Sequence, residues 1–444
     1  MKASGTPTGP PGAERVGAAR AGLLRRAVDV RGDEVGALLL SFAYFFSLLC
    51  GYYVLRPIRD EMGISRGVDK LPVLFTGTFV AMAIASPLFG WLASRWARHR
   101  LISWAYHFFA LDIVAFYALW KLGLGKGWVP YAFYIWAAVY NLFVTSVFWS
   151  FMTDVFTSEQ GKRLFGFISA GGGLGALAGP FLTSRLAKPL GGANLLLLSA
   201  LLLEVSVGCV LVLERWARRR AAVRGAAAAA DRDRPVGGTV WSGIRPVLAS
   251  PYLLASAAYI LLLTVANTFL YFQQAELVSA ATVDRDARTA LFARIDLVVN
   301  VCTLALQTLV TGHVLKQLGV AVGLGVAPAI TAAGYAVLGL SPALTVLAPF
   351  QGLRRAAQYA ILRPARELLF TVVSREERYK SKNFIDTVVF RGGDMLSGWV
   401  YAALSGVGLG VAGTAWVSVP VSVVWLALGV YLGREQRRRA REAA

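Results

Sequence analysis

The chain has 444 residues, of which 56% are hydrophobic and only 16% are charged. A soluble globular protein averages about 45–50% apolar and about 25% charged residues, so this composition excludes an ordinary soluble enzyme. The formal net charge is +20, from 45 Lys and Arg against 25 Asp and Glu. The basic surplus lies largely between apolar blocks, which is the positive-inside pattern of membrane proteins and argues against binding of nucleic acid.

Apolar blocks of about 20 residues or more, the length needed to cross a bilayer core, recur along the whole chain. They predict an all-α polytopic membrane protein with about twelve transmembrane helices. The predicted spans are 35–55, 70–93, 101–121, 128–156, 166–186, 194–213, 251–276, 291–311, 320–339, 343–370, 384–405 and 412–432. The segment before Val35 holds several arginines and no unbroken apolar stretch, which predicts a tail and not a signal peptide.

Basic residues gather in every second loop between the spans. These loops contain Arg95, Arg98 and Arg100, then Lys162 and Arg163, Arg215 and Arg218 to Arg220, Lys316, and finally Arg378, Lys380 and Lys382. Because basic loops stay on the cytoplasmic side, we expect a multi-pass inner-membrane protein with both termini in the cytoplasm. The predicted parts are a cytoplasmic tail (1–34), a six-helix half (35–213), a cytoplasmic linker (214–250), a second six-helix half (251–432) and a basic tail (433–444).

Two pairs of related loops are separated by a similar number of residues along the chain. The loop after the second span begins at Gly90, and a related loop after the eighth span begins at Gly312. The fourth loop begins at Ser158, and the tenth begins at Ser374. The separation within the first pair agrees with that within the second to within small insertions or deletions. A shared offset in two separate loops indicates two duplicated, pseudo-symmetric six-helix halves.

The loop after the second span reads Gly90-Trp-Leu-Ala-Ser-Arg-Trp-Ala-Arg-His-Arg100. It resembles the G-x-L-a-D-r-x-G-r-R signature of the major facilitator superfamily. Ser94 stands where that family usually has Asp, and Ala97 stands where it has Gly. The resemblance implies the major facilitator fold, with transport by alternating access around a cavity between the halves. An alternative interpretation is a basic cytoplasmic turn that merely follows the positive-inside pattern.

Three further segments resemble the ATP/ADP translocase family of bacteria and plastids. They are Tyr52 to Asp60, Phe148 to Asp154, and Lys382 to Asp394. The resemblance implies a twelve-helix exchanger of nucleotides, in which Arg59-Asp60 and Asp154 match family positions. This sequence departs from the family in the seventh span, where Asn267 lies in the region in which the family tends to carry Glu. We include Asn267 among the candidate substrate-binding residues.

The tenth span carries a polar stripe, and this feature predicts an anionic cargo independently of any family. Arg355, Tyr359, Arg363 and Arg366 fall within about 80° of one another on a helix. Ionisable residues within a span normally face an aqueous path, guanidinium groups grip phosphate oxygens, and Tyr359 could stack on a base. Pro364 predicts a kink within the stripe. The alternative is that these arginines snorkel to lipid headgroups.

The first span ends with a second basic face. Tyr52, Arg56 and Arg59 share it, and Asp60 follows directly. We predict that Arg56 and Arg59 contact the substrate. The alternatives are a periplasmic gate, a headgroup anchor, or pairing of Arg59 with Asp60.

Other charged residues are candidates for salt bridges that gate the cavity and for proton coupling. The predicted switching salt bridges involve Asp60, Asp154, Lys162, Arg163, Lys382, Asp386, Arg391 and Asp394, and the acidic members in the eleventh span are expected to pair with arginines of the tenth. Asp112 and Glu204 lie within spans and have no evident partner in the sequence, so either is a candidate for proton coupling. His107 has no evident partner either, and we interpret it as structural.

Several kinds of site are excluded. Gly171, Gly175 and Gly179 recur every fourth residue, which is the small-residue pattern of close helix packing; a phosphate loop would need a following Lys-Ser/Thr. The sequence predicts no enzyme, no catalytic residue, no metal and no cofactor. Its predicted partners are the lipid bilayer and a small anionic substrate, and we expect a monomer. The leading hypothesis is ATP:ADP-type exchange, and the alternatives are transport of another organic anion, with or without protons, and a non-transporting lipid-binding or partner-binding module.

Overall fold

The computed structural model describes residues 30–95, 98–224, 244–374, 377, 381–382 and 384–442, and the statements below concern this part of the chain. The tail up to residue 29, the linker from 225 to 243, and Ala97 of the signature-like loop lie outside it. The described residues are almost entirely helical. The main helices are α2 (Val35–Ile64), α3 (Leu71–Arg95), α4 (Arg98–Lys121), α5 (Val129–Val155), α6 (Ser158–Leu190), α7 (Gly192–Arg224), α8 (Ile244–Ala249), α9 (Pro251–Ala281), α10 (Arg285–Leu340), α11 (Leu344–Ala357), α12 (Arg363–Leu369), α14 (Phe390–Gly406) and α15 (Val411–Glu442).

Nine helical segments in this part of the chain are long and apolar enough to cross a membrane. They correspond to nine of the twelve predicted spans; the third, tenth and eleventh are helical but do not reach the same length and hydropathy. α4 contains His107 and Asp112, which lower its hydropathy. The tenth span is broken into short helices and carries the arginine stripe, and α14 has only 17 residues. The π-helical segments at 358–362 and 385–389, which divide these two spans into shorter helices, therefore explain two of the three differences.

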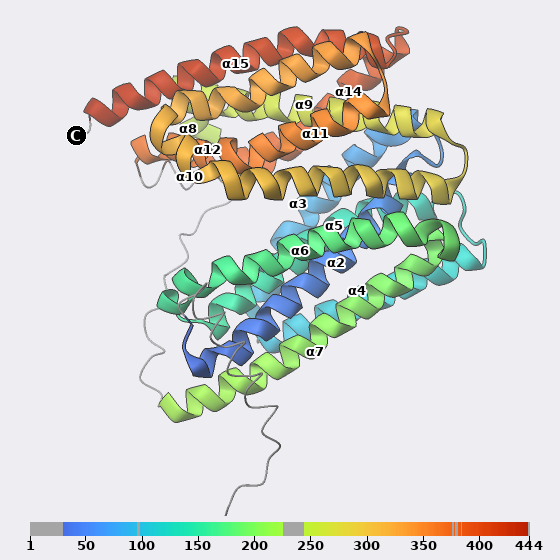
Figure 1. The fold of residues 1–444 in the computed structure, drawn as a ribbon, viewed down its shortest axis with the longest axis vertical. Helices are drawn as coiled ribbons and strands as arrows, with labels where there is room; N and C mark the ends of the chain where they lie inside the picture. Colours follow the sequence, from blue (N-terminus) through green and yellow to red (C-terminus); the bar gives the residue numbers. More distant parts are fainter. Residues whose placement is uncertain are drawn as a thin grey trace, which may run out of the picture.

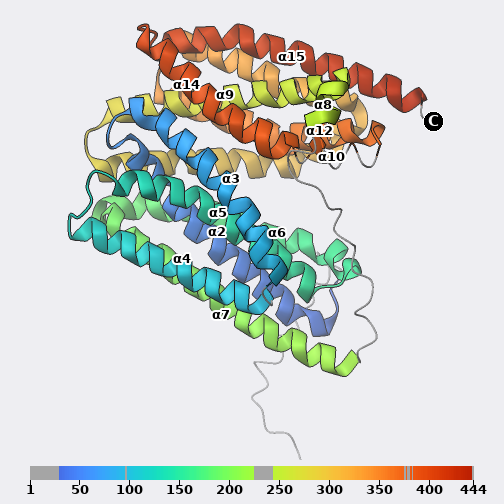
Figure 2. The same ribbon diagram turned by 180° about the vertical axis from the view of Figure 1, so that it is seen from behind.

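The helices form two bundles, which Figures 1 and 2 show side by side: α2 to α7 and α8 to α15. Each bundle has its own buried apolar cluster. The second cluster also takes in Ile64, Leu71, Leu74 and Tyr134, from the end of α2, the start of α3 and the start of α5. The two bundles are therefore joined through apolar packing at this end of α2.

The small-residue ladder of α6 packs against α2. A Cβ atom at Gly171 would lie 2.5 Å from the Phe42 carbonyl oxygen, and one at Gly175 would lie 2.4 Å from the Phe46 carbonyl oxygen. Only glycine allows the two backbones to approach this closely. The interpretation of this motif as a packing surface is confirmed.

Two segments of π-helix interrupt the spans beside the cavity described below. The first is η5 (Gln358–Leu362), between α11 and α12, and the second is η7 (Ile385–Val389), before α14. Pro364 lacks a backbone N–H and lies at the start of α12, so the regular hydrogen-bond ladder cannot continue through it. The predicted kink is therefore present as a π-turn on the amino-terminal side of Pro364. α10 holds both the eighth and the ninth span, which meet at Gly319 with φ 74°.

Candidate functional site

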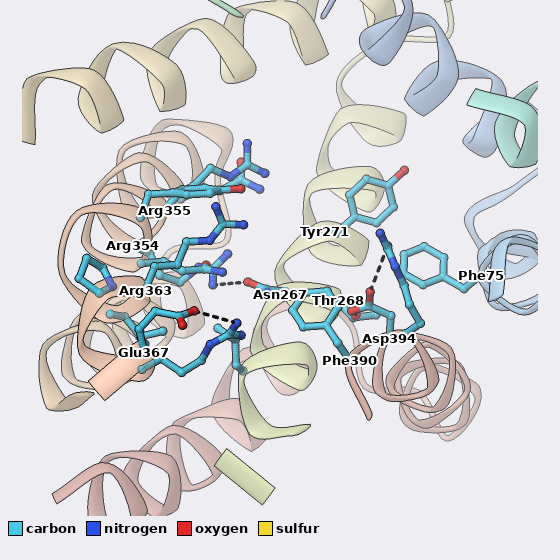
Figure 3. A pocket seen from close by; sticks show the side chains of 18 of the residues that line it. Phe75, Asn267, Thr268, Tyr271, Arg354, Arg355, Arg363, Glu367, Phe390 and Asp394 are labelled. Atoms are coloured by element: carbon cyan, nitrogen blue, oxygen red, sulfur yellow. Dashed lines mark hydrogen bonds and ion pairs between the residues drawn. The ribbon is translucent and has the colours of Figure 1, made fainter. Parts of the chain in front are cut away.

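A cavity of about 690 Å³ lies between α2, α3, α9, α11, α12 and α14. Arg363 and Glu367 are exposed at its α12 end, whereas Arg354 is buried deeper inside. The cavity therefore opens at the end that the basic loops predict to be cytoplasmic. Figure 3 shows Arg354, Arg355 and Arg363 on one wall, and Phe75, Tyr271, Phe390 and Asp394 across from them.

All four residues of the predicted stripe line this cavity, as do Arg56 and Asn267. The guanidinium of Arg363 lies 4.4 Å from the centre of the Tyr359 ring, so it covers one face of that ring. The π-turn η5 lies within the stripe and leaves these side chains on the cavity wall. The four residues that helical spacing predicted to share one face therefore line the same cavity.

Arg354 adds a buried positive charge that the predicted stripe did not include. Its side chain is only 3% exposed, and it donates a hydrogen bond of 2.6 Å to the Asn267 side-chain oxygen. Its Nε has no hydrogen-bond partner among the described residues, and none of their ion pairs includes Arg354. A buried guanidinium without a counter-ion is costly, so this position favours an anion in the cavity.

Asp296 on α10 is the main functional candidate that the sequence analysis missed. Its side chain is 6% exposed and lies 3.3 Å from Arg56 of α2 and 3.8 Å from Arg355 of α11. Its Oδ2 is buried and has no hydrogen-bond partner in the described structure. A carboxylate within the otherwise apolar stretch after Arg294 was a signal that could have identified it.

Arg59, the other arginine predicted in the first span, is not part of the cavity wall. Its Nη2 lies 2.6 Å from Asp60 Oδ1, and its guanidinium lies 4.9 Å from the centre of the Tyr134 ring. Tyr271 also donates a hydrogen bond of 3.0 Å to Asp60. The geometry therefore favours the alternative in which Arg59 and Asp60 pair, and a contact between Arg59 and the substrate stays a prediction.

Several polar contacts join α10 to the first bundle. Arg285 at the start of α10 forms two hydrogen bonds with the fully buried Glu61 of α2, at 2.8 and 3.0 Å. Asn300 donates a hydrogen bond of 2.6 Å to the Ala176 carbonyl oxygen of α6. Together with Arg56–Asp296, these contacts hold the two bundles together at the end opposite the cavity opening.

The predicted gating residues of the second bundle form pairs within that bundle. Arg366 lies 2.9 Å from Asp386, which confirms the expected contact between the tenth and eleventh spans, and Lys382 lies 2.6 Å from Glu367. Arg391 and Asp394 both line the cavity and lie 4.0 Å apart. Thr268 donates to Asp394 at 3.3 Å.

In the first bundle, Arg163 contacts the carboxylate of Glu34 at 3.4 Å. Gln160 donates a hydrogen bond of 2.6 Å to the same carboxylate, which the sequence analysis did not consider. Burial raises the pKa of Glu34, but the hydrogen bonds and the charge of Arg163 outweigh burial and hold this pKa below its ordinary value. Asp154 and Lys162 are exposed nearby in the chain, at the end of α5 and the start of α6.

Glu204 and Asp112 have partners that the sequence did not reveal. His107 of α4 and Glu204 of α7 form a contact of 3.0 Å between Nδ1 and Oε1, and Trp136 donates a hydrogen bond of 2.9 Å to Asp112. None of the four belongs to the cavity wall. The sequence shows no partner for these residues because their partners lie far away in the chain and come into contact only when the helices pack.

No family model and no curated protein matches the chain. Solved structures do match it. A mutant of the nucleoside transporter NupG is 12% identical, over 90% of this chain and 98% of that chain, with a TM-score of 0.64. A POT family transporter in complex with 5-aminolevulinic acid is 12% identical, over 91% and 96%, with a TM-score of 0.58. A bacterial homolog of the human lysosomal transporter Spinster, inward-facing and unoccupied, is 16% identical, over 92% and 98%, with a TM-score of 0.57. The chain therefore has the fold of the major facilitator transporters.

Proposed function

We propose that this protein is a membrane transporter that exchanges anionic nucleotides by alternating access, in the manner of ATP:ADP antiport. The observation that carries the proposal is the charge of the cavity wall. Among the described lining residues, arginines outnumber carboxylates six to two, and Arg354 is buried without a carboxylate partner. The cavity volume also falls within the range of about 300–1,000 Å³ that is usual for small-molecule sites.

The two walls of the cavity suit the two ends of a nucleotide. Arg354, Arg355 and Arg363 present planar guanidinium groups, which bind phosphate oxygens through pairs of parallel hydrogen bonds. Phe75 and Phe390 present aromatic surface on the opposite wall, where a base could stack. NupG, which shares the fold, is a nucleoside transporter, and a nucleotide contains the same base and sugar.

The charges of the cavity arginines also favour exchange of one substrate for another across the membrane. If the empty cavity closed, it would bury Arg354 and Arg363, for which the described residues provide no carboxylate partner, and this is expensive. A bound polyanion neutralises them and lowers the cost of closing. We infer that Asp296 holds Arg56 and Arg355 in the empty cavity and that the cargo displaces it. We further propose that both termini lie in the cytoplasm and that the protein spans the inner membrane, on the basis of the basic loops.

The runner-up is a transporter of another organic anion, with or without proton coupling. The observation in its favour is Asp394, a carboxylate that faces the cavity and would repel a nearby phosphate. The arginine-rich wall argues against a module that only binds lipid or a partner.

The test is uptake of radiolabelled ATP and ADP by the purified protein in liposomes, with and without internal counter-substrate. Exchange predicts uptake only with internal nucleotide. Arg355→Gln and Arg363→Gln should each weaken binding by about tenfold or more, since a charge-assisted hydrogen bond is worth about 1.5–3 kcal/mol. The matched control is Arg185→Gln, an exposed arginine of α6 beside Phe181 and outside the cavity wall.

Unchanged affinity in both cavity variants would contradict the proposed binding site. Uptake of a non-nucleotide anion into substrate-free vesicles, driven by a pH gradient, would favour the runner-up.

A further inference from the structure

His107 and Glu204 form a polar pair on the outer surface of the first bundle. Their side chains are 57% and 43% exposed although Nδ1 and Oε1 lie 3.0 Å apart. Glu204 lies halfway along the candidate membrane span Gly192–Ala217. The pair therefore lies at a depth where the surroundings are lipid tails unless another protein surface covers it.

Such a position is unusual. Ionisable residues within spans almost always face protein or a water-filled cavity, because lipid tails cannot hydrogen-bond to them. Figures 1 and 2 show α4 and α7 side by side on the side of the first bundle that faces away from the second bundle. No helix of the described chain covers this face, and the transport cavity does not use the pair.

The exposed residues around the pair have the spacing of a helix-packing seam. On α4 they are Trp104, Phe108 and Leu111, with His107 between them, and on α7 they are Leu201, Val205 and Gly208, with Glu204 between them. Each set follows the pattern i, i+3, i+4, i+7, which keeps its members on one side of a helix. A Cβ atom at Gly208 would meet nothing within 4 Å, so a further helix could approach closely there. We call these eight residues the α4–α7 face.

The hydrogen-bonding groups of the pair are self-complementary. One contact joins Nδ1 to Oε1, and no hydrogen bond of the described structure involves His107 Nε2 or Glu204 Oε2. A net-neutral pair holds two protons, one shared between Nδ1 and Oε1 and one on Nε2, and lipid surroundings favour the neutral pair. In that pair Nε2–H is left as a donor and Oε2 as an acceptor. Rotation by 180° about the membrane normal preserves depth, so a second copy presents the same donor and acceptor at the same height.

We propose that the α4–α7 face is the interface of a homodimer, in which His107 of each copy donates to Glu204 of the partner subunit and the apolar residues around the pair interlock. This proposal replaces the expectation of a monomer from the sequence. It does not depend on the cargo, because neither His107 nor Glu204 lines the cavity.

The experiment measures the dimer fraction of the full chain in liposomes, by single-molecule photobleaching of a C-terminal fluorophore over a range of protein-to-lipid ratios. The native chain should dimerise. The double variant His107→Leu/Glu204→Leu should need about tenfold or more higher protein density for the same dimer fraction. It keeps an apolar surface compatible with lipid, and monodisperse elution with unchanged helical circular dichroism checks that it folds.

A second measurement locates the interface. In a chain without its native cysteines, Leu111→Cys should form a disulfide between copies on mild oxidation. The control is Val424→Cys, an exposed position on α15, which should not crosslink. A native chain that stays monomeric at every density would overturn the proposal. A dimer that the double variant does not weaken, or that crosslinks through Val424→Cys instead, would overturn it as well.

Discussion

Asp296→Asn removes the carboxylate that links Arg56 and Arg355 in the empty cavity while leaving the side chain almost the same size. The two contacts measure 3.3 and 3.8 Å, and unit charges at about 3.5 Å interact by about 5 kcal/mol at an effective dielectric constant of about 20. Because a cargo anion must break these contacts, native binding includes this loss and the variant avoids it.

The expected result is tighter binding. If the cargo regains one charge-assisted hydrogen bond, worth about 1.5–3 kcal/mol, the affinity for nucleotide should rise by about 10- to 100-fold. The empty variant should also melt at a lower temperature, since it leaves buried arginines without their counter-ion. Nucleotide should therefore raise its melting temperature by more than it raises that of the native protein.

Binding by isothermal titration calorimetry and thermal unfolding with and without nucleotide measure both effects. The matched control is Asp69→Asn, an exposed carboxylate that pairs with the neighbouring Lys70. Weaker binding by Asp296→Asn would refute the reasoning, because it would show that Asp296 orients the arginines for the cargo and does not compete with it.

Two further predictions rest on single contacts, and a third rests on the basic loops. Asp386→Asn removes the partner of Arg366 and should slow exchange several-fold, while the equilibrium affinity for substrate stays within about threefold. The reason is that this contact biases the equilibrium between conformational states and is not a cargo contact. Loss of substrate binding would place Asp386 in the binding site. Gly175→Leu would push a side chain into the Phe46 carbonyl oxygen and should destabilise the protein by about 1–3 kcal/mol or more, measured as a lower melting temperature. The control Gly173→Ala should not lower the melting temperature, because a Cβ atom at Gly173 meets nothing within 4 Å. Cysteine-accessibility labelling should find both termini on the cytoplasmic side, and labelling of either from outside would contradict the topology.

The sequence alone was sufficient for the fold. Hydropathy depends on local composition, so blocks of about 20 apolar residues reveal membrane helices without any knowledge of their packing. The repeated loops at Gly90 and Gly312 indicated the two pseudo-symmetric halves, and the shared fold with major facilitator transporters agrees with that expectation. The stripe from Arg355 to Arg366 could also be predicted from the sequence, since helical periodicity places these residues on one face and charged side chains do not face lipid.

Partners that lie far apart in the chain could be decided only by the tertiary structure. Asp296 meets Arg56 although the two lie in different halves of the chain, and Glu204 meets His107 from a different helix. Periodicity shows which residues share a face of one helix, but it does not show which face of another helix lies opposite. For this reason Arg59 was expected at the cavity and is found beside Asp60, and Asp296 was missed although it holds two of the cavity arginines. The sequence determined where the charges lie along each helix, and only helix packing decided which of them meet.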